Sequence, residues 1–99
     1  MKHELKTWPE YFDKIWSGRK TFEVRKNDRH FKEGEYVLLR EWSVTEGYSG
    51  REVLTTITYI FRGGSLGGLL PDFVVFSFEE NSRSEKPNKR SRKQNHTND

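Results

Sequence analysis

Residues 18–25 are Gly-Arg-Lys-Thr-Phe-Glu-Val-Arg, and this octet joins a predicted helix to a predicted strand. Successive side chains of a strand point to opposite faces. Thr21, Glu23 and Arg25 therefore share one face, and the two apolar residues between them share the other. We expect the apolar pair to point into a core and the three polar side chains to point together away from it, toward a common neighbour.

Lys20 lies at the corner between helix and strand, from which its side chain can reach the polar face. A carboxylate flanked by a lysine and an arginine stays ionised and anchored. Such a group suits a polar ligand with both donors and acceptors, for example a nucleobase or a phosphate. The alternative is a solvated outer face with weak cross-strand pairing, because surface charges usually contribute little. Phe22 and Val24 are expected in the core under either interpretation.

The composition predicts one small domain. Of the 99 residues, 33% are charged and 31% are hydrophobic, so the core must be small and rich in aromatic residues. The absence of cysteine excludes a disulfide scaffold and a zinc site with thiolate ligands. His3, His30 and His96 lack the spacing of metal ligands, so we expect no metal and no cofactor. Because no apolar run could span a membrane or act as a signal peptide, we expect a soluble, cytoplasmic protein.

Positive charge is concentrated at the C-terminal end. The net charge is +3, but residues 82–99 carry six basic and two acidic side chains, whereas residues 1–81 carry 12 basic and 13 acidic ones. Since no hydrophobic residue follows position 81, we expect a domain over residues 1–80 and a disordered basic tail over residues 81–99. The tail either binds nucleic acid non-specifically or only improves solubility. The nearly neutral body favours a local pocket over a broad phosphate-binding surface.

The predicted helix follows a first strand over residues 3–6. Thr7 can cap it, and Glu10 three residues later completes a capping box. Gly18 provides the left-handed residue that ends it. Its apolar stripe, most of which we expect in the core, consists of Trp8, Phe12, Ile15 and Trp16.

Four further strands are predicted from alternating and β-branched residues, over residues 21–25, 36–42, 51–61 and 73–78. Residues 43–50 are expected to be a hairpin loop with a solvated Arg51 at its end, and residues 62–70 a glycine-rich connector. One helix and several non-parallel strands favour an α+β, mainly β fold. We expect a small barrel of about five strands, closed or half closed, with the helix between the first two strands.

The octet resembles the signature of the ASCH superfamily, whose members have a PUA-like β-barrel. The matching residues are Gly18, Lys20, Glu23 and Arg25. Three flanking segments strengthen the resemblance: residues 3–6 before the helix, 25–29 after the strand and 58–60 before the glycine-rich connector. Over residues 2–79 the chain looks like a subfamily of small, uncharacterised ASCH-like proteins of bacteria and their phages.

The resemblance implies a connection with RNA, because ASCH and PUA-like domains are associated with RNA and their signature residues line a cleft beside the barrel. The function it favours is an RNA- or nucleotide-binding module. Some members resemble small amidohydrolases that deacetylate 4-acetylcytidine, and others have been proposed as single-strand ribonucleases, so a hydrolase with Lys20 and Glu23 as catalytic residues is the alternative. A further alternative is a phage factor that binds a host protein or sequesters a nucleotide.

The amidohydrolase members use a lysine, a threonine and a glutamate. The lysine corresponds to Lys20, but Glu23 occupies the position of the threonine, and a carboxylate cannot replace a hydroxyl nucleophile without a change of mechanism. Thr21 is the nearest hydroxyl in the sequence. In a hydrolase, Glu23 would act as general base or acid, and Lys20 or Arg25 would stabilise the oxyanion. The candidates for a later glutamate are Glu41, Glu52 and Glu79.

In a binding module, Glu23 would accept a hydrogen bond from an exocyclic amine or ring N–H, and Lys20 and Arg25 would hold a phosphate or carbonyl. An aromatic side chain that stacks on the base would contribute about 1–3 kcal/mol. The stacking candidates are Trp8, Trp42 and Tyr48. The other ligand-binding candidates are Thr21 in the octet, His3 and Lys6 in the first strand, and Asn27, Asp28 and Arg29 after the second. The expected partner is RNA, a nucleoside or a nucleotide, without a membrane, and the chain is taken as a monomer.

Overall fold

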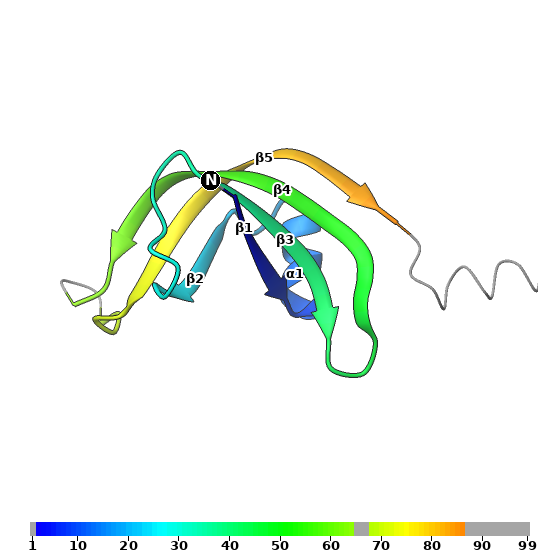
Figure 1. Ribbon diagram of the computed structural model, residues 1–99, viewed down its shortest axis with the longest axis horizontal. Helices are drawn as coiled ribbons and strands as arrows, with labels where there is room; N and C mark the ends of the chain where they lie inside the picture. Colours follow the sequence, from blue (N-terminus) through cyan, green and yellow to red (C-terminus); the bar gives the residue numbers. More distant parts are fainter. Residues whose placement is uncertain (1, 65–67, 87–99) are drawn as a thin grey trace, which may run out of the picture.

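In the described part of the chain, five strands form one sheet that curls into a half-barrel over one short helix (Figure 1). The computed structural model describes residues 2–64 and 68–86. The elements are β1 (Lys2–Thr7), α1 (Pro9–Trp16), β2 (Phe22–Lys26), β3 (Tyr36–Ser43), β4 (Gly47–Arg62) and β5 (Phe73–Glu85). The expected α+β, mainly β fold with a helix between the first two strands is confirmed.

The strand order β1-β3-β4-β5-β2 puts the first two strands at opposite edges of the sheet. β1 is parallel to β3, and the other neighbours are antiparallel. The curl brings these two edges together, and side chains bridge the gap between them: Arg25 Nη2 donates to the carbonyl oxygen of Lys6 at 2.7 Å, and Arg29 Nη1 donates to that of Glu4 at 3.0 Å. We call this gap between β1 and β2 the seam.

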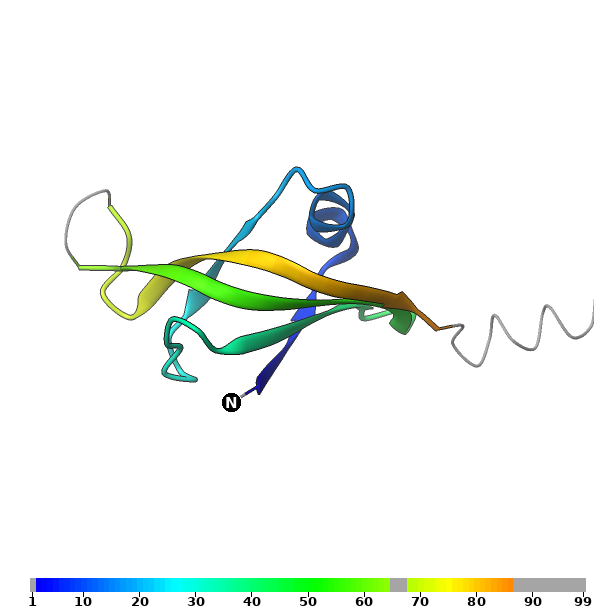
Figure 2. The same cartoon turned by 90° about the horizontal axis from the view of Figure 1, so that it is seen from above.

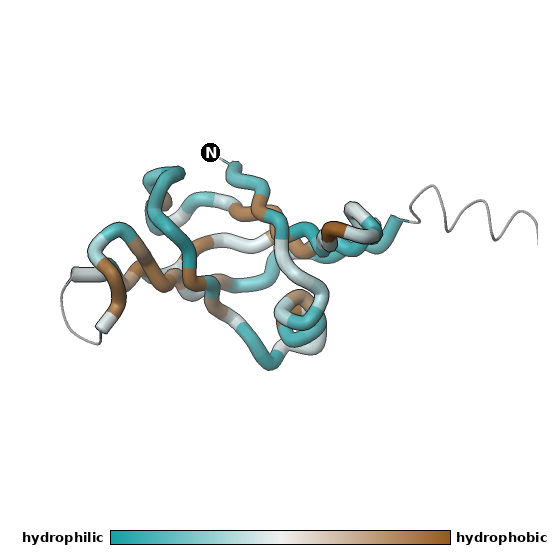
Figure 3. The backbone as a smooth tube through the Cα atoms, turned by 90° about the horizontal axis from the view of Figure 1, so that it is seen from below, coloured by the Kyte–Doolittle hydropathy of each residue, from teal (hydrophilic) through white to brown (hydrophobic). Residues whose placement is uncertain are grey.

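The core lies between α1 and the concave face of the sheet, so that α1 covers one side of the sheet (Figure 2). Hydrophobic stretches lie in the middle of the strands and in α1, whereas the start of β1 and the turn after β2 are hydrophilic (Figure 3). The buried hydrophobic residues are Leu5, Phe12, Ile15, Phe31, Val37, Leu39, Val53, Ile57, Ile60, Val74, Phe76 and Phe78. Eight of the twelve come from β3, β4 and β5, which explains why these strands alternate so clearly in the sequence.

The helix ends where expected but begins differently. Gly18 has φ +81°, the left-handed conformation predicted for the residue that ends α1. The prediction that Thr7 caps α1 is wrong, because Thr7 is the last residue of β1 and the N-cap residue is Trp8, with no side-chain cap. In the apolar stripe, Phe12 and Ile15 are buried, Trp16 is partly buried and Trp8 is half exposed.

Two strands are longer than the sequence indicated. β4 begins at Gly47, so the predicted loop over residues 43–50 is wrong and the hairpin turn is only residues 44–46. β5 continues to Glu85 and pairs residues 82–85 with the start of β4, so residues 81–85 are strand and extend the domain beyond residue 80. The backbone hydrogen bonds of a strand pair need no hydrophobic side chain, which is why composition missed this extension. Residues 87–99 of the expected tail lie outside the described residues.

The faces of β2 are the reverse of the prediction. Glu23 pairs in register with Phe76 and is only 3% exposed, whereas Phe22 and Val24 are 43% and 49% exposed. The carboxylate therefore points to the concave face and the apolar pair points outward. β2 is an edge strand whose outer face is not covered, and the charge of Glu23 is compensated locally, so burial of this side chain is tolerated.

Candidate functional site

A buried carboxylate between two cations is the centre of the candidate site. Lys20 Nζ lies 2.5 Å from Glu23 Oε2, and Arg25 Nε donates to Glu23 Oε1 at 2.9 Å. We call these three residues the Glu23 cluster. Lys20 is held at the helix-to-strand corner because its backbone N–H and that of Arg19 both donate to the carbonyl oxygen of Lys14. The prediction that the octet brings these three charged groups together is confirmed.

The Glu23 cluster lines a cavity of about 550 Å³ at the seam, between the end of β1, the first turn of α1 and β2. The apolar residues around it are Trp8, Tyr11, Phe22 and Val24, each about half exposed. Lys20 Nζ lies 5.0 Å from the centre of the Phe22 ring. The cavity therefore combines aromatic surface with both signs of charge.

Thr7 contributes a hydroxyl group to the same cavity. Its side chain is buried, with 3% of the residue exposed, and no polar atom of the described residues forms a hydrogen bond with its Oγ1. A buried polar group without a partner costs about 1–3 kcal/mol. Sequence reasoning assigned Thr7 to the helix cap; the signal for its position was the alternation of β1, in which His3, Leu5 and Thr7 all face inward.

Two other predicted residues adjoin the cavity. Lys6 lines it, and its Nζ lies 4.3 Å above the ring of Trp42. Trp42 is not among the residues that line the cavity, but its ring lies 5.7 Å from that of Trp8. Trp42 therefore supports the two residues, Lys6 and Trp8, that reach the cavity.

Three of the predicted ligand-binding residues do not line this cavity, and their contacts stabilise the fold instead. His3 is buried, hydrogen-bonded to Glu35 at 2.7 Å and packed edge-on against Phe31. The hydrogen bond from His3 lowers the pKa of Glu35. Asn27 Oδ1 accepts a hydrogen bond from the N–H of Phe31 and shapes the turn after β2. Thr21 is exposed just before β2, where its carbonyl oxygen accepts from the backbone of β5.

Asp28 and Arg29 line a second cavity of about 430 Å³, farther along the seam. Lys6 and Arg25 line both cavities. Tyr48, predicted as a stacking residue, also borders this second cavity, and its ring lies 3.8 Å from the guanidinium of Arg40. The structure thus divides the predicted ligand-binding residues between two adjoining cavities.

The later glutamates lie away from the first cavity. Glu52 is bound by Arg40 at 2.9 Å, and Glu79 is exposed. Glu41 is buried and accepts two hydrogen bonds from Arg51 at 2.9 Å and one from Ser49 at 2.6 Å. Although burial alone would raise it, these hydrogen bonds hold the pKa of Glu41 below its usual value.

Arg51 was predicted to be solvated in a turn, and that prediction is wrong. It lies in β4, and its Nη2 also donates to Asp13 of α1 at 2.6 Å. Hydrogen bonds to Glu41 and Asp13 raise the pKa of Arg51, although burial opposes the shift. Asp13, Glu41, Ser49 and Arg51 form the Glu41 cluster, which joins α1 to the sheet.

The described residues contain no group of three or more His, Asp or Glu side chains able to hold a metal ion. Among the same residues, no helix has the length and apolar character that a membrane crossing requires. The first cavity offers the Glu23 carboxylate, the cationic side chains of Lys6, Lys20 and Arg25, the Thr7 hydroxyl and aromatic rings.

The fold and the site define a small, mainly β half-barrel with a charged, aromatic cleft between its edge strands. Within that class, the chain belongs to the family described as "Domain of unknown function (DUF3850)", whose model matches residues 2–78. It is also similar to the "Uncharacterized 12.9 kDa protein in GpA 3'region" of Escherichia phage P2, with 37% identity over 73 residues. That match covers 74% of this chain and 63% of the phage protein, so the chain spans less than two thirds of its relative's length.

Proposed function

We propose that the protein is an ASCH-like, RNA- or nucleotide-binding module that holds a nucleobase in the cavity of the Glu23 cluster. The observation that carries the proposal is the convergence of Lys20, Glu23 and Arg25 on a cavity of about 550 Å³ with aromatic walls. Ligand cavities usually measure about 300–1,000 Å³ and combine apolar walls with a few convergent polar groups.

The reversed faces of β2 support this interpretation. An edge strand that buries a glutamate and exposes a phenylalanine and a valine contradicts the simple rule for placing side chains. Such local conflicts concentrate at functional sites, where stability is given up for activity. Binding of a planar, partly apolar base would cover Phe22 and Val24 and would use the buried carboxylate.

The hydrogen-bonding groups also match a nucleobase. A carboxylate offers about four acceptor positions, and the contacts with Lys20 and Arg25 occupy two of those on Glu23. An amine or ring N–H of a base can donate to the others. The ammonium group of Lys20 has two further donors for a base carbonyl, and Trp8 and Tyr11 provide faces for stacking.

Titration of intrinsic tryptophan fluorescence tests the proposal, because Trp8 lines the cavity. The ligands are the four common ribonucleosides, their 5′-monophosphates and a single-stranded hexaribonucleotide of each base. We expect saturable binding of at least one base and at least a tenfold loss of affinity in Lys20→Met, as removal of one charge-assisted hydrogen bond predicts.

Lys14→Met is the matched control, since Lys14 lies on the exposed surface of α1 and lines neither cavity at the seam. Its affinities should equal those of the wild type. Absence of binding to every nucleoside, nucleotide and hexamer would contradict the proposal.

A second candidate, a hydrolase of a modified nucleoside, is favoured by the buried hydroxyl of Thr7 in the cavity of Lys20 and Glu23. In this candidate, Thr7 Oγ1 attacks the acetyl carbon of 4-acetylcytidine and its proton passes to Glu23. Lys20 stabilises the oxyanion, and Glu23 then returns the proton to the departing amine. Water afterwards hydrolyses the threonyl ester and releases acetate.

Chromatography of cytidine released from 4-acetylcytidine tests this candidate. Release that Thr7→Val, Lys20→Ala and Glu23→Ala each abolish would support it. No release by the wild-type protein would eliminate this reaction and leave the binding module as the function of the site.

A further inference from the structure

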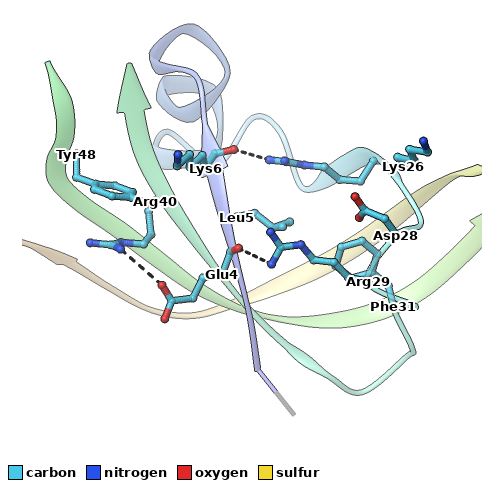
Figure 4. Close-up of a pocket in the computed structure, with 10 residues that line it drawn as sticks. Glu4, Leu5, Lys6, Lys26, Asp28, Arg29, Phe31, Arg40 and Tyr48 are labelled. Atoms are coloured by element: carbon cyan, nitrogen blue, oxygen red, sulfur yellow. Dashed lines mark hydrogen bonds and ion pairs between the residues drawn. The ribbon is translucent and has the colours of Figure 1, made fainter. Parts of the chain in front are cut away.

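The second cavity at the seam is strongly cationic (Figure 4). Five of its lining residues are basic and two are acidic. The basic ones are Lys6, Arg25, Lys26, Arg29 and Arg40, and the acidic ones are Glu4 and Asp28. They come from three separate segments: β1, the end of β2 with its following turn, and β3.

The cations differ in how fully their charge is compensated. Arg40 pairs with Glu52 at 2.9 Å and approaches Glu4 at 3.5 Å, and Arg25 pairs with Glu23. Within the described part of the chain, however, Lys6, Lys26 and Arg29 form no salt bridge with a carboxylate.

Arg29 is held in place by a neutral group. Its Nη1 donates to the backbone carbonyl of Glu4, which fixes the guanidinium beside β1 while leaving its charge uncompensated (Figure 4). A guanidinium has five donors in a planar fork, and a single contact leaves most of them available. A cation that is oriented in advance and not neutralised is suited to bind an oxyanion.

The two cavities adjoin because Lys6 and Arg25 line both of them. The Glu23 cavity has aromatic walls and a carboxylate, which suit a base. The cationic cavity lies farther along the same seam and suits a phosphate. A nucleotide has these two parts joined through a sugar.

We propose that the cationic cavity is a phosphate subsite for the ligand whose base occupies the Glu23 cavity. The ligand is therefore a nucleotide or an RNA strand lying along the seam, and not a free nucleoside. This inference rests on the proposed function. Lys26 and Arg29 bind the phosphate, and Lys6 and Arg25 lie between phosphate and base.

Comparison of three ligands of the same base tests the subsite in the full chain: the nucleoside, its 5′-monophosphate and the single-stranded hexaribonucleotide. The base is the one that binds tightest in the nucleoside series. We expect the monophosphate or the hexamer to bind about tenfold or more tightly than the nucleoside, as a charge-assisted hydrogen bond to phosphate predicts. A gain with the monophosphate identifies a terminal phosphate, and a gain with the hexamer alone identifies a phosphodiester.

Three variants test whether this gain in affinity for the phosphorylated ligands comes from the cationic cavity. Arg29→Gln should remove it and leave the affinity for the nucleoside unchanged. Lys26→Gln should reduce it in the same way, and because Lys26 is exposed at the end of β2, this variant tests the subsite without removing the contact between Arg29 and β1. Asp28→Asn should strengthen binding of the phosphorylated ligands only, since it removes a negative charge from the cavity.

Equal affinities for all three ligands would overturn the subsite while leaving the base site intact. A gain with the hexamer that survives both Arg29→Gln and Lys26→Gln would also overturn it, because the phosphate contacts would then lie elsewhere on the chain. If none of the three ligands binds, the proposed function itself fails. Lys14→Gln, which changes charge on α1, should leave every affinity unchanged.

Discussion

The Glu23 cluster and the Glu41 cluster are built alike but have different surroundings. In each, a buried glutamate of the sheet accepts hydrogen bonds from a basic side chain at 2.9 Å or less. Glu23 is 3% exposed and Glu41 is 7% exposed. Charge and burial alone therefore do not distinguish the two.

The difference lies in the space beside each carboxylate. The guanidinium of Arg51 lies 5.3 and 5.1 Å from the rings of Phe12 and Trp16, and its other contacts join Glu41 to Asp13. The Glu41 cluster thus packs between α1 and the sheet and holds them together. The Glu23 cluster faces a cavity with half-exposed apolar walls and the hydroxyl of Thr7, which has no hydrogen-bond partner among the residues that the structure describes. This open space is the feature on which the proposed binding site rests.

Arg51→Ala should cause the largest loss of stability. It leaves Glu41 buried without its cation, and breaking a buried ion pair in this way costs about 3–5 kcal/mol. Urea denaturation followed by circular dichroism measures the free energy of unfolding. Arg83→Ala, which removes an exposed pair with Glu80 and the contacts of Arg83 with Trp16, is the control and should cost clearly less. Equal losses in the two variants would refute a structural role specific to the Glu41 cluster.

The same cluster should give stability a defined pH dependence. The pKa of Glu41 in the folded state lies below its ordinary value of about 4.5, so between these two values the unfolded state binds more protons. The stabilisation is complete above about pH 4.5 and is lost as the pH falls through the folded-state pKa. Glu35 and Glu80, whose pKa values are also lowered, add to this loss.

In Arg51→Ala this contribution of Glu41 is absent, so the difference in stability from the wild type should narrow below pH 4.5. Urea titrations at several pH values measure that difference. A difference in stability between the variant and the wild type that stays constant down to pH 3 would show that Glu41 does not cause the pH dependence.

Two buried threonines should respond oppositely to removal of the hydroxyl. Thr7→Val removes an Oγ1 without a hydrogen-bond partner in the described part of the chain and should stabilise the fold by about 1 kcal/mol. Because Thr7 lines the cavity, the same change should lower affinity for the base. Thr55→Val removes a hydrogen bond to the carbonyl oxygen of Val37 at 2.8 Å and should destabilise it by about 1 kcal/mol, with no change in affinity. Thermal denaturation and fluorescence titration of both variants test the pair. Destabilisation by Thr7→Val would mean that its hydroxyl has a partner in the unliganded protein.

The smallest expected effect tests the reversed faces of β2. Val24→Thr should change stability by no more than about 0.5 kcal/mol, because Val24 is half exposed. Val74→Thr on the neighbouring strand should cost about 1–3 kcal/mol, because Val74 is 2% exposed and the new hydroxyl would be buried. Similar costs for both would place Val24 in the core, as the alternation of hydrophobic residues suggested.

Local patterns sufficed to predict most of the fold. The left-handed Gly18 marks the end of α1, and the alternation in β3 and β4 follows from burial of one face. The grouping of Lys20, Glu23 and Arg25 was predictable because these residues lie within six positions and one strand face brings two of them together.

The remaining features depend on contacts between distant segments. Which face of β2 points inward is set by its pairing with β5, because alternation defines two faces without assigning either to the core. The contact of Arg51 with Glu41 and Asp13 requires β3, β4 and α1 to be in place. The cationic cavity likewise exists only once the curl brings the turn after β2 beside β1.

The arginine contacts across the seam have a consequence for self-association. The edge of a sheet exposes carbonyl and N–H groups that can pair with a strand from another molecule. Arg25 and Arg29 occupy two carbonyls on the open edge of β1, at Lys6 and Glu4. A strand from a second molecule would have to displace both guanidinium groups before it could add to β1. The side chains that we assign to ligand binding also protect the sheet from growing into an aggregate.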